Sequence, residues 1–115
     1  DIIIRMNNFN QLNLSDDSLK ILKGLKFENP TPIQEKVIPV ALQGNDVMGT
    51  AQTGSGKTLS YILPIVEKLR INVNDKFLIL TPTRELAEQV FSVAKIFLGY
   101  GKPFKAINNF KNSLL

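Results

Sequence analysis

Apolar and polar positions along the chain switch between the spacing of amphipathic helices and the dense apolar runs of buried strands. The first third of the chain shows helical spacing. Ser15, followed by two acidic residues, predicts the start of a helix, and Gly24 lies near its predicted end. A second helix is predicted to begin at Pro32 and to run through Leu42, where Pro39 is expected to kink or split it.

Short apolar runs further along the chain predict strands. Residues 46–50 form the first, and residues 76–81, centred on Phe77-Leu78-Ile79-Leu80, form the second. An uninterrupted apolar run between helices is typical of a parallel strand that is covered on both faces. Residues 104–107 predict a third strand, whereas residues 108–115 give no clear signal.

Helical spacing follows each of the two main strands. One helix is predicted to end at about Arg70 with a bend at Pro64, and another to run from about Glu85 to Leu98. Helices that alternate with buried strands predict an α/β layer structure with a mostly parallel sheet.

The amino-acid composition limits the possible chemistry of the protein and says less about its fold. A chain of 115 residues with 43% hydrophobic content has room for one small domain with a core. Its formal net charge of +4 permits an anionic partner without requiring one. The absence of Cys and His excludes disulfides, thiolate metal sites and imidazole bases.

Targeting signals are not found in the sequence. The longest apolar runs are far shorter than the roughly 20 residues that cross a bilayer, and Ile2-Ile3-Ile4 is too short for a signal-peptide core. We therefore expect an intracellular protein with no membrane partner. Because the chain begins at Asp1, we also expect it to be part of something longer.

The strongest chemical motif is Ala51-Gln52-Thr53-Gly54-Ser55-Gly56-Lys57-Thr58, a phosphate-binding loop between the first predicted strand and a helix. Its glycines allow a tight turn that brings backbone N–H groups to a phosphate chain. Lys57 is predicted to reach the β- and γ-phosphates, and the Thr58 hydroxyl to ligate Mg²⁺. The helix that follows would direct its N-terminus at the phosphates.

Two upstream residues have a structural and a functional interpretation. Thr31, Pro32 and Gln34 form the pattern of a capping box, in which Gln34 satisfies the Thr31 backbone N–H. Phe9 stands alone in an Asn-rich stretch, where it would anchor the N-terminal arm to the body of the protein.

Three motifs in order resemble the Q motif, motif I and motif Ia of the DEAD-box RNA helicases. They are Phe27-Glu28-Asn29-Pro30-Thr31-Pro32-Ile33-Gln34, the phosphate-binding loop, and Pro82-Thr83-Arg84-Glu85-Leu86. Ala51 at the head of the loop is that family's version, and Phe9 lies 17 residues before Lys26, where the family has an isolated aromatic. The resemblance implies an incomplete RecA-like P-loop NTPase domain over residues 1–115, with residues 1–34 as its Q-motif region.

The resemblance also implies roles in nucleotide binding, with ATP and Mg²⁺ as cofactors. Gln34 would read the adenine edge, and Phe9 would stack on the base for about 1–3 kcal/mol. Lys57 and Thr58 would be the catalytic residues, with Thr58 as metal ligand. The full set of expected nucleotide-binding residues is Phe9, Thr31, Gln34, Thr53, Gly54, Ser55, Gly56, Lys57 and Thr58.

Motif Ia implies contact with the RNA sugar–phosphate backbone, independent of base sequence. The residues concerned are Pro82, Thr83, Arg84 and Glu85. A salt bridge from Arg84 to Glu85 or Glu88 is the structural alternative. A second RecA-like domain and self-association through an open sheet edge are the other expected partners.

Departures from the family pattern limit the expected activity. Lys26 replaces the usual Gly, which is acceptable if the backbone there is ordinary, and the sequence contains no Asp-Glu-Ala-Asp. Without that carboxylate motif or the arginines of a second domain, the chain is expected to bind ATP but not to hydrolyse it efficiently. A different P-loop NTPase remains an alternative, as does a non-enzymatic fragment that binds nucleotide, RNA or only a protein.

Overall fold

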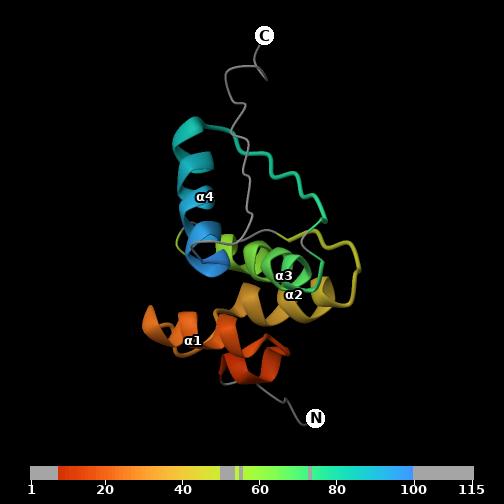
Figure 1. Cartoon of the computed structure of the whole chain (residues 1–115), viewed down its shortest axis with the longest axis vertical. Coiled ribbons are helices and arrows are strands. Elements are labelled where there is room, and N and C mark those ends of the chain that lie inside the picture. Colours follow the sequence, from red (N-terminus) through yellow and green to blue (C-terminus); the bar gives the residue numbers. More distant parts are fainter. Residues whose placement is uncertain (1–7, 50–53, 55, 73, 100–115) are drawn as a thin grey trace.

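A computed structural model describes residues 8–49, 54, 56–72 and 74–99 of the chain. Within these residues all regular secondary structure is helical. The element order is η1 (Phe9–Leu12, a short 3-10 helix), α1 (Asp16–Gly24), α2 (Pro32–Leu42), α3 (Lys57–Ile71) and α4 (Arg84–Leu98). Helix α3 lies in the middle, with α1 and α2 on one side and α4 rising from the other (Figure 1).

The helix boundaries confirm the local sequence signals. Ser15 caps α1 by accepting a hydrogen bond from the Ser18 backbone N–H at 3.3 Å, and α1 ends at Gly24 as predicted. Pro32 occupies the first turn of α2 after Thr31. Pro39 lies inside α2 without splitting it, and α3 likewise continues through Pro64.

One apolar core joins the helices through α3. Helical spacing in the sequence predicts a buried face for α3 made of Leu59, Ile62, Leu63, Val66 and Leu69, and the structure confirms it, with the first four buried and Leu69 partly buried. Helix α2 contributes Ile38, and α4 contributes Val90, Ala94, Phe97 and Leu98. Helical periodicity therefore predicted the core-facing residues of α3 and much of the core-facing side of α4.

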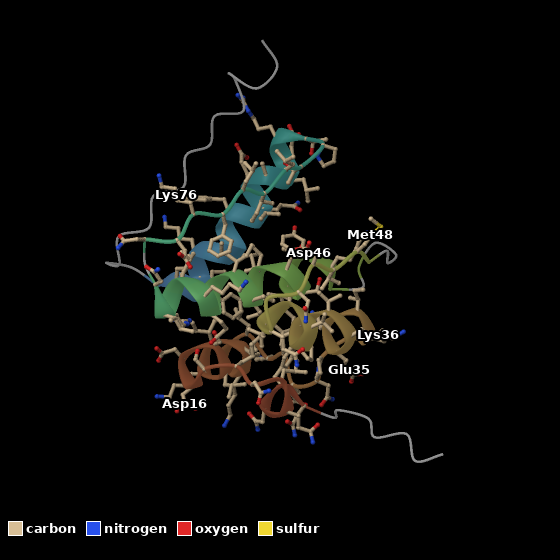
Figure 2. The ribbon with its side chains drawn as sticks, turned by 90° about the vertical axis from the view of Figure 1, so that its right-hand side faces the viewer. Asp16, Glu35, Lys36, Asp46, Met48 and Lys76 are labelled. Atoms are coloured by element: carbon tan, nitrogen blue, oxygen red, sulfur yellow. The ribbon has the colours of Figure 1, made fainter. Side chains whose placement is uncertain are left out.

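The predicted parallel sheet is not confirmed. Residues 45–49 and 75–80 have no regular secondary structure, and within the described residues no backbone hydrogen bond pairs residues 46–49 or 76–80 with another segment. Met48 is 98% exposed, and Leu78 and Leu80 are each 83% exposed. Figure 2 shows Met48 at the outer end of its segment and Lys76 on the segment that leads to α4. A strand is stabilised by its neighbours' backbone groups, and no described segment supplies them here.

The remaining strand predictions fall on Thr50 and on residues 104–107, which lie outside the described residues. Within the described part of the chain, none of the helices has the length and apolar character needed to span a bilayer.

Candidate nucleotide-binding site

The start of α3 meets the start of α2 at Gly56, one of two left-handed glycines before α3. Gly56 has φ +85° and is the N-cap of α3, while Gly54 has φ +82°. A Cβ atom at Gly56 would lie 2.5 Å from the Gln34 amide nitrogen and 3.0 Å from the Thr31 hydroxyl oxygen. Both the backbone conformation and the available space therefore require glycine at position 56.

Gln34 connects the two helix starts. Its Oε1 accepts a hydrogen bond from the Thr31 backbone N–H at 2.9 Å, and its Nε2 donates to the Gly56 carbonyl oxygen at 3.1 Å. The first bond confirms the capping interpretation. A carboxamide has two N–H donors and two acceptor lone pairs, so these two bonds leave one donor and one acceptor position unused on a side chain that is 3% exposed.

The Thr31 hydroxyl faces the same point from its capping position, toward the Gln34 backbone N–H of the capping box. Thr31 Oγ1 is buried at its capping position, yet it makes no hydrogen bond of normal geometry within the described residues. Buried hydroxyls are usually bonded. This unsatisfied oxygen, the glycine cradle at Gly56 and the first turn of α3 form a polar set that fits a phosphate-bearing ligand.

Lys57 and Thr58 open α3 directly after this cradle. Lys57 is exposed and lines a groove of about 630 Å³ between α2, α3 and the two unpaired segments. Asp46 lines the same groove (Figure 2), and Thr58 is partly buried. Thr53 and Ser55 lie outside the described residues. Within the described ranges, no group of three or more acidic residues is placed to hold a metal ion. The role of Thr58 as Mg²⁺ ligand stays a prediction.

The structure places Phe9 in the core, where its side chain also lines a cleft. Its side chain is 4% exposed and packs within the apolar cluster, which agrees with the anchor interpretation. Phe27, at the head of the Q motif, is 48% exposed and lines a cleft of about 420 Å³ together with Phe9.

Lys26 has an unusual backbone. Its φ is +64°, in the left-handed region, so the condition of an ordinary backbone at this position is not met. Glycine adopts this conformation without cost, which explains why the family pattern has Gly here.

The predicted RNA-contacting residues surround the start of α4. Pro82, Thr83, Arg84 and Glu85 are all exposed. Thr83 caps α4, its Oγ1 accepting a hydrogen bond from the Leu86 backbone N–H at 3.1 Å. The hydroxyl proton of Thr83 is not used by that bond, so it can still donate to a phosphate oxygen.

Solved structures indicate the class of protein to which this arrangement belongs. The chain matches a crystal structure of a DEAD box protein from the hyperthermophile Methanococcus jannaschii with a TM-score of 0.75 and 40% identity, covering 96% of this chain and 33% of that one. The RNA helicase Prp28 from Chaetomium thermophilum, solved bound to ADP, matches with a TM-score of 0.75 and 35% identity over 97% of this chain and 30% of that one. The described fold is therefore related to the RecA-like domains of DEAD-box helicases.

Sequence comparison gives the family directly. The DEAD/DEAH box helicase model matches residues 31–112. ATP-dependent RNA helicase DRS1 from Lodderomyces elongisporus is 47% identical over 95 residues, covering 80% of this chain and 14% of that protein. Its Aspergillus niger counterpart is 50% identical over 91 residues, covering 76% of this chain and 11% of that protein. The chain belongs to the DEAD/DEAH box helicase family, and it spans about a seventh or less of these curated relatives.

Proposed function

We propose that this chain is the ATP-binding portion of an ATP-dependent RNA helicase. The observation that carries the proposal is the junction of Gln34 with Gly56, which brings the Q motif and the start of α3 to one point. Family membership and the relatives' names support it. An intracellular location, where ATP and RNA are available, is part of the same proposal.

In the proposed complex, the triphosphate lies against the first turn of α3. Lys57 binds the β- and γ-phosphates, and backbone N–H groups at Gly54 and Gly56 hold the β-phosphate. Mg²⁺, bound through Thr58, would neutralise phosphate charge. Gln34 reads adenine through its remaining N–H and lone pair, while its other two positions keep the helix cap and the Gly56 contact.

RNA would bind at the start of α4. The exposed Thr83 hydroxyl and Arg84 guanidinium beside a helix N-terminus suit a phosphate backbone. Such binding would be independent of sequence and would weaken as salt rises.

ATP hydrolysis would need groups beyond those that bind the triphosphate. Phosphoryl transfer requires a carboxylate that positions metal and water, and usually an arginine that stabilises the transition state. The sequence contains no Asp-Glu-Ala-Asp, so we propose nucleotide binding with turnover by the isolated chain at background level.

The proposal also includes self-association of the chain. Leu78 and Leu80 form an exposed, unpaired apolar segment, and exposed apolar backbone of this kind favours pairing with another chain. A second RecA-like domain of a longer protein is the other expected partner.

Nucleotide preference tests the proposal. Wild-type chain is titrated with fluorescent ATP and GTP analogues, alongside Gln34→Ala and the matched control Gln89→Ala, an exposed glutamine on α4. We expect ATP to bind more tightly than GTP, Gln34→Ala to weaken ATP binding about tenfold, and the control to bind as wild type.

The other functions predict different titrations. Equal affinity for ATP and GTP would favour a different P-loop NTPase. No binding of either nucleotide by folded protein would favour a non-enzymatic role in protein or RNA binding. Circular dichroism of Gln34→Ala separates lost recognition from lost folding.

A further inference from the structure

A buried polar cluster outside the nucleotide site joins three helices through Glu67 and Arg70 on α3. Glu67 bonds the start of α1: its Oε2 accepts from the Ser15 backbone N–H at 3.0 Å, and its Oε1 accepts from the Ser15 hydroxyl at 2.9 Å and the Ser18 hydroxyl at 2.5 Å. Ser18 is completely buried. The N-terminus of α1 is therefore capped by an acid from a different helix.

Arg70, one turn later, bonds the end of α4. Its Nη2 donates to the Phe97 carbonyl oxygen at 2.7 Å and, more weakly, to the Ser18 hydroxyl at 3.4 Å. Its guanidinium also lies 3.8 Å from an Asp17 carboxylate oxygen and 3.9 Å from that of Glu67. The Phe97 carbonyl belongs to the last turn of α4, where carbonyl groups have no partner within the helix.

The charges match the helix dipoles. Helix α3 supplies an anion to the positive end of α1 and a cation to the negative end of α4. Both side chains are largely buried, so water screens these interactions less than at an exposed site. Removing either partner would leave the other charge poorly compensated.

Arg70 lies at the junction of α3 and α4, so a small change in the angle between the two helices there would displace their far ends. In Figure 2, α3 and α4 meet at their C-terminal ends, and their N-terminal ends diverge. The diverging ends are the start of α3, beside the phosphate-binding loop, and the start of α4, with Thr83 and Arg84. A helix of this length is about 22 Å long, so a rotation of about 10° at the junction would move its far end by about 4 Å.

We infer that Glu67 and Arg70 are positioning residues that hold the RNA-contacting start of α4 at a set distance from the nucleotide-binding start of α3. They act through the cap of α1 and the last turn of α4, and touch neither ligand. The inference rests on the proposed function for the identity of the two ligands, but the geometry it describes can be measured without them.

The test measures that geometry and ligand binding separately. Because the chain contains no Cys, spin labels are attached specifically through Lys36→Cys on α2 and Gln89→Cys on α4, both at exposed positions. Pulsed dipolar spectroscopy then gives the distance distribution for the unaltered background, Arg70→Met and Glu67→Gln. Lys68→Met is the matched control on α3 for the distance and the RNA affinity, since no hydrogen bond or ion pair of its side chain is found within the described residues. Because Lys68 lines the same groove as Lys57, ATP affinity is compared with the unaltered background instead.

We expect Arg70→Met to shift or broaden the distribution by about 3 Å or more, and Glu67→Gln to do so by less, since Gln can still accept hydrogen bonds from the two serines. Affinity for single-stranded oligouridine RNA should fall about threefold to tenfold in Arg70→Met, while ATP affinity changes less than about twofold. Arg70→Lys, which keeps the charge and stem but not the planar fork, should lie between wild type and Arg70→Met.

Distances and RNA affinity in both variants equal to those of Lys68→Met would overturn the inference. Equal losses of ATP and RNA affinity would also overturn it, because they would indicate general destabilisation. If wild-type chain binds no RNA but Arg70→Met still changes the distance, the positioning role is supported and the RNA part of the proposed function fails.

Discussion

At the residue scale, Lys26 has a side chain that disfavours the backbone conformation it adopts. Its φ of +64° lies where residues other than glycine are strained, and Asn13, at φ +61°, is of a type that tolerates this region better. Lys26 therefore stabilises the turn after α1 less than the Gly of the family pattern would.

We expect Lys26→Gly to raise the free energy of unfolding by about 0.5–1 kcal/mol, the relief of strain exceeding the added flexibility of the unfolded chain. Urea denaturation measures the change. The matched substitution Lys23→Gly, inside α1, should instead lower stability by about 1 kcal/mol. A destabilising effect of Lys26→Gly would contradict the strain argument.

Gly56 is a position where the structure has no room for a side chain. Because an added Cβ would lie 2.5 Å from Gln34 Nε2 at a backbone φ of +85°, we expect Gly56→Ala to cost about 1–3 kcal/mol and to abolish measurable ATP binding. Thermal unfolding and nucleotide titration provide the two measurements. Gly24→Ala is the control, since nothing lies within 4 Å of its added methyl group. Normal ATP binding by Gly56→Ala would mean that the cradle is not the site.

At the element scale, the helices could be predicted and the sheet could not be confirmed. Caps such as Ser15 and Thr31 and the apolar spacing of α3 act within a few residues, so the local sequence was sufficient to predict them. A strand depends on partners distant in sequence, and no described segment pairs with residues 76–80. The strand predicted at Phe77-Leu78-Ile79-Leu80 is therefore not confirmed within the described residues.

The exposed leucines of that segment give a prediction about association. We expect Leu78→Lys combined with Leu80→Lys to shift the sedimentation of the chain toward monomer, with little loss of helix content because both side chains are exposed. A matched pair at Lys20→Leu and Lys23→Leu, exposed on α1, tests whether any added apolar surface promotes association. Wild-type chain that stays monomeric at high concentration would contradict the proposal.

Individual residues of the candidate site could be predicted from the sequence, but the hydrogen bonds that join them could not. Sequence reasoning found Gln34 as a capping residue and Gly56 as a loop glycine, each from local patterns. Their hydrogen bond spans 22 residues and depends on how α2 packs against α3, which no short motif encodes. The same holds for Glu67 and Arg70, whose partners lie up to 52 residues away.

At the scale of the whole molecule, α3 is the common support. Its first turn forms the candidate phosphate grip, its apolar face forms the core with α2 and α4, and its later turns bond the ends of α1 and α4. A change in the orientation of α3 would thus alter the nucleotide site, the core and the RNA-contacting surface together.

The central claim is that nucleotide binds where the start of α2 meets the start of α3. The most direct test is a titration of isotopically labelled chain with ADP and with ATP–Mg²⁺, followed through backbone amide chemical shifts. The account predicts the largest shifts at Thr31, Gln34, Gly56 and Lys57, and small shifts in the C-terminal half of α4. Unchanged amides at the junction, or shifts concentrated elsewhere, would contradict it.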